Sequence, residues 1–333
     1  MRRLCQGPGA GMQLERIREP VADELRRLDQ VIVDRLASDV ALVNQVSQYI
    51  IGAGGKRLRP LAVLLAARAC GYRGARHVEA AAIIEFIHTA TLLHDDVVDG
   101  SGLRRGRDTA NQVFGNQASV LVGDYLYSRA FQMMVELGDM RVQGIMADAT
   151  NTIAMGEVLQ LMNAHDPDTS EQRYLEVIYR KTARLFEAGA QMAAILAQAP
   201  PVVERAMLAY GRHLGTAFQL VDDALDYRAD RDELGKNLGD DLAEGKPTLP
   251  LIHALANSAP QDAARLRAAI EHGAVEELEA ITRTIESSGG LEYTARLARR
   301  ERDLAIEALA ELPDSAYKQA LRALADFAVS RKH

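Results

Sequence analysis

Apolar residues recur at helical spacing from Leu14 to the end of the chain, and only short breaks separate the helical stretches. Alanine and leucine are frequent, aromatic residues make up 5% of the chain and tryptophan is absent, which favours helix over strand. Long helices with short connections pack as bundles. We therefore predict an all-α bundle of about ten helices, the longest over residues 75–99, 116–137, 139–164, 170–199 and 202–228.

Local signals indicate where several helices begin. Thr169 and Gln172 match a capping-box pattern, and Asn116 is an N-cap candidate. Pro201 and Pro247 stand where the first turn of a helix tolerates proline. We expect helices to start at these four places.

The first 13 residues differ from the rest of the chain. Residues 1–13 are rich in glycine and lack periodicity, so we expect a disordered tail, and Met12 is a second candidate for the start. No linker, low-complexity segment or solenoid repeat interrupts the chain after it. A single domain over residues 14–333 is the simplest interpretation.

Composition excludes several classes of protein. The net charge of −7 argues against a general nucleic-acid binder, because such proteins use basic surface to bind phosphates. No apolar run approaches the ~18 residues that span a bilayer, so we expect no transmembrane segment. The two cysteines, Cys5 and Cys70, do not suggest a disulfide framework, which favours a reducing compartment and a cytoplasmic location.

Two boxes of the form Asp-Asp-x-x-Asp carry the first chemical signal: Asp95, Asp96 and Asp99, and Asp222, Asp223 and Asp226. Each places carboxylates on one face near a helix C-terminus, where like charges repel and the macrodipole disfavours anions. Hard oxygen ligands without paired His or Cys indicate Mg²⁺, bound jointly with a substrate phosphate. The plainer alternative is two solvated acidic helix ends.

Basic residues gather in two short segments of this acidic chain, Gly54-Gly55-Lys56-Arg57-Leu58-Arg59-Pro60 and Leu103-Arg104-Arg105-Gly106-Arg107. Glycine lets the backbone approach an anion, arginine offers a planar fork to phosphate oxygens and lysine a point charge. We interpret both segments as diphosphate sites, although each alone is more typical of a solvated turn. Lys181, Lys236 and Lys246 are weak signals by themselves.

Taken together and in their order along the chain, these motifs resemble those of the trans-isoprenyl diphosphate synthases, the polyprenyl synthetase family. Beyond the boxes and the basic segments, the resemblance includes Lys181-Thr182, Gln219-Leu220-Val221 and Gly245-Lys246-Pro247. It is closest to the bacterial octaprenyl diphosphate synthases. It implies the isoprenoid synthase fold, a homodimer of helical bundles with a central cavity and three Mg²⁺ ions, which joins isopentenyl diphosphate to an allylic diphosphate.

The resemblance also implies roles for individual residues. The metal ligands would be Asp95, Asp96, Asp99, Asp222, Asp223 and Asp226. The allylic diphosphate would be bound by Arg104, Lys181, Thr182, Gln219, Lys236 and Lys246, and isopentenyl diphosphate by Lys56, Arg59, His88 and Arg105. The residues expected to act on the departing diphosphate are Asp95, Asp99, Arg104, Lys181, Asp222 and Lys236.

Small residues before the first box bear on product length. Ala90 and Thr91 lie about one helical turn before Asp95, where a bulky residue blocks elongation in this family. We therefore expect a product of about C40–C50, built from farnesyl diphosphate for a quinone such as ubiquinone. Met133 and Met134 are candidates for a deeper floor, or simply core residues. A shorter, geranylgeranyl-type product is the alternative.

Other classes of function remain open. Glu85 and His88 form a Glu-x-x-His pattern that ligates di-iron centres in ferritin-like bundles, but no second copy is present. A non-catalytic subunit of a heteromeric prenyl synthase would usually lose an aspartate box, and this chain keeps both. In a terpene cyclase, the basic segment Gly54 to Pro60 would have no role.

Overall fold

The computed structural model describes residues 10–52, 54–104, 106–228 and 239–331. Its α-helices are α1 (Ala10–Arg18), α2 (Ala22–Leu36), α3 (Ala41–Gly52), α4 (Leu58–Ala69), α5 (Arg76–Val98), α6 (Ala110–Phe114), α7 (Asn116–Leu137), α8 (Met140–Asn163), α9 (Glu171–Ile178), α10 (Arg184–Leu196), α11 (Pro201–Leu225), α12 (Asp240–Ala243), α13 (Leu249–Asn257), α14 (Pro260–His272), α15 (Leu278–Ser287), α16 (Gly290–Ala308) and α17 (Ala316–Ser330).

Shorter elements complete the described chain. The strands β1 (Leu103–Arg104) and β2 (Arg107–Asp108) pair as an antiparallel hairpin. A π-helical turn, η2 (Tyr179–Ala183), joins α9 to α10 without a break, and the 3-10 turns are η1 (Glu19–Val21), η3 (Val275–Glu277) and η4 (Leu309–Glu311). The all-α class predicted from the sequence is confirmed.

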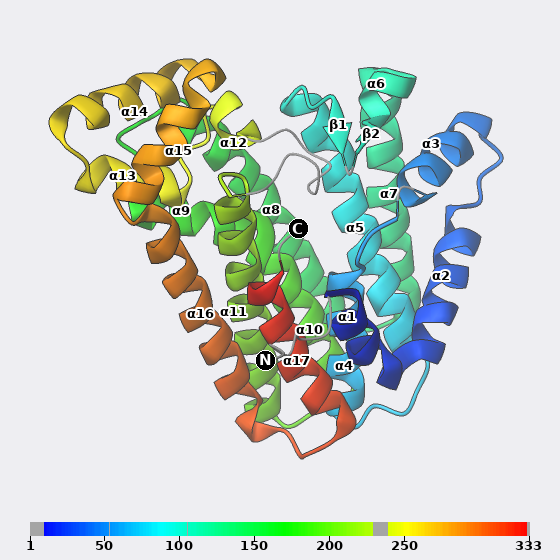
Figure 1. Ribbon diagram of the computed structural model, residues 1–333. Coiled ribbons are helices and arrows are strands. Elements are labelled where there is room, and N and C mark those ends of the chain that lie inside the picture. The colour runs from blue at the N-terminus through cyan, green and yellow to red at the C-terminus, as the bar shows by residue number, and fades with distance from the viewer. Residues whose placement is uncertain (1–9, 53, 105, 229–238, 332–333) are drawn as a thin grey trace, which may run out of the picture.

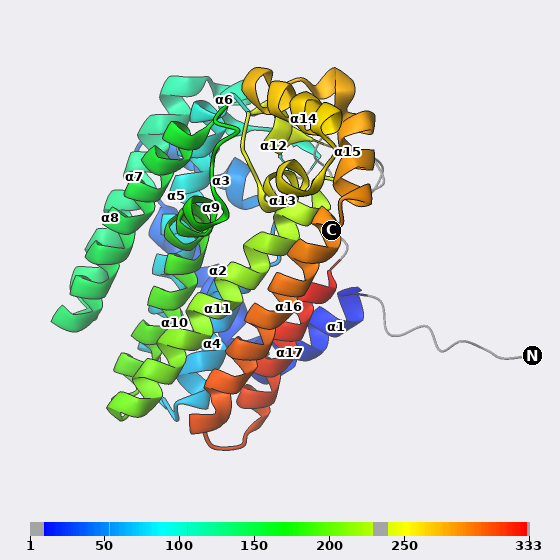
Figure 2. The ribbon, with the colours of Figure 1, turned by 90° about the vertical axis from the view of Figure 1, so that its left-hand side faces the viewer.

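The long helices run alongside one another as a bundle (Figures 1 and 2). Helices α5 and α11 both finish at the same end, near the β1–β2 hairpin and α12 (Figure 1). Helices α13, α14 and α15 gather at this end too, whereas α7 and α8 form an outer layer on one side (Figure 2). None of the helices in the described ranges is long and apolar enough to cross a membrane.

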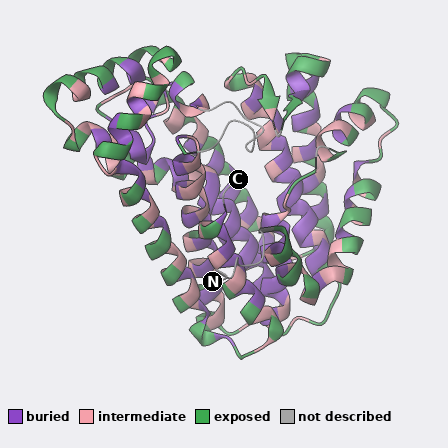
Figure 3. Ribbon diagram, viewed as in Figure 1, coloured by how far each residue is buried: buried purple, intermediate pink, exposed green. Residues whose placement is uncertain are grey.

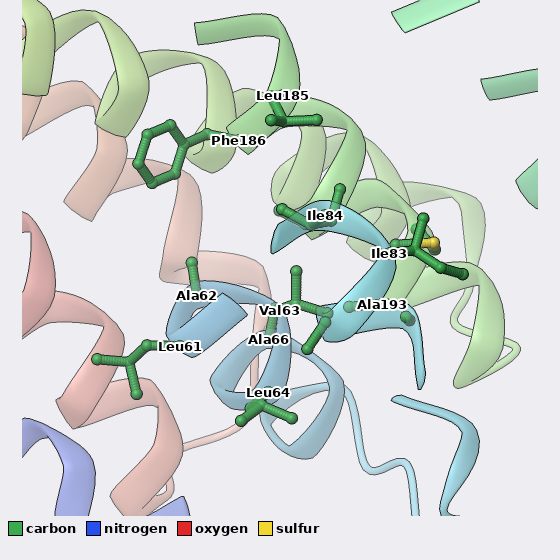
Figure 4. Packing of buried hydrophobic residues seen from close by; sticks show 14 of the residues in the cluster. Leu61, Ala62, Val63, Leu64, Ala66, Ile83, Ile84, Leu185, Phe186 and Ala193 are labelled. Atoms are coloured by element: carbon green, nitrogen blue, oxygen red, sulfur yellow. The ribbon is translucent and has the colours of Figure 1, made fainter. Parts of the chain in front are cut away.

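Helix α4 lies at the centre of the main core, packed against α5, α10 and α17. Leu61, Leu64 and Leu65 have no exposed surface, and Ile83 and Ile84 of α5 are equally buried. Figure 4 shows this packing, and Figure 3 shows buried residues along the inner faces of the bundle. Burial of apolar surface on this scale is the main stabilising contribution to folding, so the bundle gives the helix ends a rigid support.

A glycine permits a close contact between two helices of this core. A Cβ atom at Gly211 of α11 would lie 2.4 Å from the backbone oxygen of Phe186 in α10. No side chain fits there, so the two backbones touch directly. This contact fixes α11, which carries the second aspartate box, against α10.

The helix spans follow the sequence prediction closely, but several details differ. Helix α1 begins at Ala10, four residues before the expected boundary, and residues 1–9 lie outside the described ranges. The stretch 170–199 is divided by the π turn. The remaining differences concern the caps.

Three of the four predicted capping or first-turn residues do not occupy the position expected of them. Ser170 rather than Thr169 caps α9, because its side chain accepts the backbone N–H of Arg173. Gly115 occupies the cap position before α7, so Asn116 is already helical. Pro250, not Pro247, lies in the first turn of α13. Pro201 does begin α11 as expected.

Candidate active site

The two aspartate boxes lie at the C-terminal ends of α5 and α11 and face one cavity of about 800 Å³. Five of the six box residues line it: Asp95, Asp99, Asp222, Asp223 and Asp226. The cavity is also lined by Lys56, Arg59, His88, Arg104, Lys181, Thr182, Gln219 and Lys246, all of which the sequence singled out. Arg105 and Lys236 lie outside the described residues.

Three of the cavity aspartates are each paired with a cation from another element. Lys181 Nζ lies 3.6 Å from Asp95 Oδ2, and Lys246 Nζ lies 2.9 Å from Asp99 Oδ2. The third contact joins Asp222 to Arg331, a residue that the sequence did not indicate. Because these cations offset the repulsion within each box, the carboxylates can stand close together before any ligand is present.

Burial and neighbouring charges act together on this cluster. Burial raises the pKa of Asp95 although Lys181 opposes the shift. Burial alone would lower the pKa of Lys246, but the charges of Asp99 and Glu244 raise it above its ordinary value. Both Lys181 and Lys246 therefore stay charged at neutral pH, as phosphate-binding groups must.

Glu157 of α8 is a site residue that the sequence reasoning missed. Its Oε2 lies 2.7 Å from Lys181 Nζ. Burial raises the pKa of Glu157 to about 7, against the opposing charge of Lys181 and with the help of Asp95. The neighbouring Gly156 lets α8 approach the π turn closely, since a Cβ at Gly156 would lie 2.9 Å from the backbone nitrogen of Lys181. In the sequence, Glu157 belongs to neither aspartate box and is marked only by following Gly156.

Asp96 differs from the other box residues and does not line the cavity. It is fully buried, and its Oδ1 accepts bonds from Arg104 Nε at 2.9 Å and Nη2 at 2.6 Å. Its Oδ2 is buried without a hydrogen-bond partner among the described residues. The Asp96 carboxylate holds Arg104 of β1 at the edge of the cavity. Its role as a metal ligand, which the resemblance implied, stays a prediction.

The second box is braced by hydrogen bonds that reach back to the π turn. Asp223 accepts bonds from Tyr174 at 2.5 Å and from Gln219 Nε2 at 2.7 Å. Thr182 in turn donates to Gln219 Oε1 at 2.8 Å. Burial, with the charge of Asp241, raises the pKa of Asp223 to about 7. Thr182, Gln219 and Asp223 thus form one connected unit.

The basic segment Gly54 to Pro60 runs into the first turn of α4, and its Arg59 contacts both α5 and α10. Arg59 Nη1 lies 3.0 Å from His88 Nε2, and its guanidinium stacks over the ring of Phe186 at 4.8 Å. Lys56 and Arg59 both line the cavity. This brings together the residues that the resemblance assigned to isopentenyl diphosphate, except Arg105.

Of the residues expected to control product length, only Thr91 lines the cavity. Ala90 beside it is fully buried. Met133 and Met134 of α7 are each 1% exposed and belong to the main core cluster. Of these four residues, Thr91 is therefore the one whose side chain reaches the cavity.

The donor set suits Mg²⁺ shared with a substrate. Across the four described ranges, no three His, Cys, Asp or Glu side chains lie close enough to hold a metal ion alone. Mg²⁺ is commonly bound by one or two carboxylates together with substrate phosphates and water, so a separated set of carboxylates around a cavity fits it. The same finding leaves the di-iron alternative without support in these ranges.

Comparison with known proteins agrees with this geometry. The family model for polyprenyl synthetase matches residues 40–286. The chain is 56% identical to an octaprenyl diphosphate synthase of Escherichia coli over 96% of this chain and 99% of that protein. It is 49% identical to an all-trans-nonaprenyl-diphosphate synthase, described as geranyl-diphosphate specific, of Rhodobacter capsulatus, over 94% and 96%.

A solved structure has the same fold. The crystal structure of a polyprenyl synthase from Caulobacter crescentus, complexed with calcium and isoprenyl diphosphate, superposes with a TM-score of 0.93 at 46% identity, covering 96% of this chain and 98% of that one. Sequence and fold therefore agree over nearly the whole length, and the chain belongs to the polyprenyl synthetase family of prenyltransferases.

Proposed function

We propose that this protein is a Mg²⁺-dependent, long-chain all-trans polyprenyl diphosphate synthase that adds isopentenyl units to an allylic diphosphate. The observation that carries the proposal is the single cavity lined by carboxylates of both boxes and by two groups of basic residues. Two diphosphates need two sets of cations, and the cavity offers Lys56 and Arg59 as one set and Arg104, Lys181 and Lys246 as the other. A terpene cyclase or a non-catalytic subunit would leave one set without a purpose.

The residues of the cavity divide the work between the two substrates. Lys56, Arg59 and His88 hold isopentenyl diphosphate beside α4. The allylic diphosphate is bound by Lys181, Thr182, Gln219, Arg104 and Lys246, with Arg105 and Lys236 as further candidates outside the described residues. These fixed cations orient the two reacting carbons and stabilise negative charge on the departing diphosphate.

Metal ions complete this charge balance. Asp95, Asp99, Asp222 and Asp226, with Asp223 behind them, would hold the ions, and we propose three Mg²⁺ per site. When bound, Mg²⁺ supplies positive charge that helps the diphosphate to leave. Lys181 and Lys246, now paired with Asp95 and Asp99, would then turn from the carboxylates toward phosphate oxygens.

The product is proposed to be about C40–C50, because small and medium side chains lie below the first box. The names of the relatives, octaprenyl and nonaprenyl diphosphate synthases, support the same range. Farnesyl diphosphate is the proposed primer, and a quinone side chain, as in ubiquinone, the proposed use. The free thiol of Cys70 suits the cytoplasmic location expected from the sequence.

A homodimer is proposed from the outer layer formed by α7 and α8. Large apolar side chains are exposed there: Leu121 and Val135 on α7, and Met140, Val158, Leu161 and Met162 on α8, each at least 58% exposed. An apolar surface of this kind on a monomer usually marks an interface. The described helices pack into one bundle, which supports a single domain.

Incubation with farnesyl diphosphate, labelled isopentenyl diphosphate and Mg²⁺, followed by sizing of the dephosphorylated lipids, tests the function. We expect labelled products of about C40–C50, none in the presence of EDTA, and a loss of at least ~100-fold for Asp95→Asn or Asp222→Asn. Geranyl diphosphate in a parallel series identifies the preferred primer. If the wild-type protein makes nothing longer than the starter, the proposed function is wrong.

A further inference from the structure

Glu85 and His88, the Glu-x-x-His pattern on α5, are each contacted by one arginine of the basic segment Gly54 to Pro60, which runs into the first turn of α4. Arg57 Nη1 donates to Glu85 Oε1, and Arg59 Nη1 lies 3.0 Å from His88 Nε2. The two acceptors stand about one helical turn apart on the same face of α5. The segment is therefore docked on the helix that carries the first aspartate box.

The guanidinium of Arg57 differs from the charged groups of Lys56 and Arg59 because it is paired with the carboxylate of Glu85. The Arg57 and Glu85 side chains are only 16% and 12% exposed, and both line the large cavity as well as a small one of about 30 Å³ beside it. Lys56 and Arg59 are the cations proposed to hold isopentenyl diphosphate. Arg57 lies between them in sequence but is committed to a carboxylate.

The backbone at Arg57 is strained. Its φ is 50°, in the left-handed region that residues with a side chain rarely adopt. This conformation begins α4, and the Arg57 oxygen accepts the first bond of that helix from Leu61 at 2.9 Å. Strain of this kind persists only where surrounding contacts hold it, and the ion pair to Glu85 is the side-chain contact that does so.

Neighbouring contacts hold the rest of the segment. Arg18 of α1 donates to the backbone oxygen of Lys56 at 2.9 Å, and Arg59 stacks on Phe186. Lys56 and Arg59 are thus fixed on either side of Arg57. A change at Arg57 would rotate the backbone between them and misplace both ammonium and guanidinium relative to a diphosphate.

We propose that Arg57 and Glu85 are a positioning pair, which keeps the strained turn before α4 in place so that Lys56 and Arg59 face isopentenyl diphosphate together. The proposal rests on the function proposed above. In this proposal, Arg57 holds the backbone of the site in place and does not bind a substrate. It also gives Glu85 a role that needs no metal.

The chain offers a closely matched control. Arg68 and Glu24 join α4 to α2 with side-chain exposures of 18% and 13% and an Nε to Oε1 distance of 2.8 Å, and neither lines the cavity. Glu24→Gln removes an ion pair as buried as that of Glu85→Gln. Any effect of Glu85→Gln that Glu24→Gln lacks belongs to the position and not to lost stability.

Steady-state kinetics with each substrate varied in turn tests the pair. We expect Arg57→Gln and Glu85→Gln each to raise KM for isopentenyl diphosphate about tenfold and KM for the allylic substrate less than about twofold. The double variant should be no worse than either single one, because residues that act only through each other are not additive. Arg57→Lys, which keeps the charge, should recover most of the affinity.

Calorimetric titration with isopentenyl diphosphate alone separates failure of the pair from failure of the function. Weakened binding to Glu85→Gln but not to Glu24→Gln supports the pair. An active wild-type protein with equal KM changes for both substrates, or with Glu85→Gln no different from Glu24→Gln, overturns the inference and leaves the function intact. A wild-type protein that neither binds nor converts isopentenyl diphosphate overturns both.

Discussion

Arg331 Nη1 lies 2.6 Å from Asp222 Oδ1, so the residue after α17 reaches the second aspartate box. The same guanidinium donates to the Phe218 backbone oxygen and lies 3.7 Å from the centre of its ring. Helix α17 also packs on α4 in the core. The end of the chain is thereby linked to both sides of the cavity.

Replacing Arg331 with Met should destabilise the metal-free protein by about 2 kcal/mol, because the buried Arg331 loses its hydrogen bonds and its contact with the partly exposed Asp222. The loss should shrink when Mg²⁺ and pyrophosphate are added, since metal ions then neutralise Asp222. Thermal unfolding with and without these ligands measures the difference.

Arg302→Met is the control for that comparison. Arg302 pairs with Asp326 of α17 at 2.7 Å, and neither residue lines the cavity. The Arg302→Met variant should lose the same amount of stability with and without Mg²⁺ and pyrophosphate. An equally constant loss for Arg331→Met would show that Arg331 is unconnected with the metal site.

Gly156→Ala should impair catalysis more than stability. Its new Cβ would lie 2.7 Å from the Arg180 Cβ and would push the π turn, with Lys181, away from Asp95. We expect kcat to fall about tenfold or more, because a small displacement of a charged group in a site is costly. Gly144→Ala on the same helix has open space around its Cβ. It should keep full activity and gain about 0.5 kcal/mol; equal kcat values for the two variants would contradict the assignment.

Stability should depend on pH through Glu157. Its pKa is raised in the folded protein to about 7 from an ordinary 4.5. The folded state therefore binds a proton more readily, and the stability that this gives is lost as the pH rises from about 4.5 through about 7. Metal-free wild-type protein should lose more stability than Glu157→Gln between about pH 5 and about pH 8.

The control for the pH series is Glu176→Gln. Glu176 lies on α9 and forms an exposed ion pair with Arg180 of the π turn. Exposed pairs contribute little, so this variant should follow the wild-type curve. Melting temperatures across the pH range, with EDTA present, give the slopes. Parallel curves for the wild type and Glu157→Gln would exclude Glu157 as the cause.

Bulk below the first box should shorten the product. Thr91→Phe places a ring at the cavity wall, and Ala90→Tyr places one in fully buried space beside it. Both should shift the product below about C40, and Ala90→Tyr should also cost about 1–3 kcal/mol through overpacking. Thr91→Val keeps the volume and should leave the length unchanged. Chromatography of the dephosphorylated lipids measures it, and wild-type lengths from both aromatic variants would rule out a path for the tail along these residues.

The sequence predicted the helices well because apolar spacing and glycine or proline breaks are local signals. Residues 75–99 became α5 (Arg76–Val98), and 116–137 matched α7 at both ends. Caps were less predictable. Thr169 and Ser170 are adjacent and chemically alike, and the fold of the preceding turn decided which hydroxyl faces the backbone of α9.

The site was predicted in part. Asp95 and Asp222 face the cavity because box spacing fixes the face of a helix. The contact between Asp96 and Arg104 was not predictable, because Arg104 comes from a hairpin whose two-residue strands leave no pattern in the sequence. Arg331 lies more than 100 residues from Asp222, so only the packing of α17 brings the two together.

The π turn sets the rotation of α10 relative to α9 about their shared axis. One additional residue in a turn rotates the following helix by roughly 100° relative to the preceding one. Tyr174 and Ile178 before the turn pack in one cluster, whereas Leu185 and Phe186 after it belong to the main core. A single-residue deletion there would leave a continuous helix, yet it would put the apolar stripes of its two halves out of phase with the clusters that each must fill.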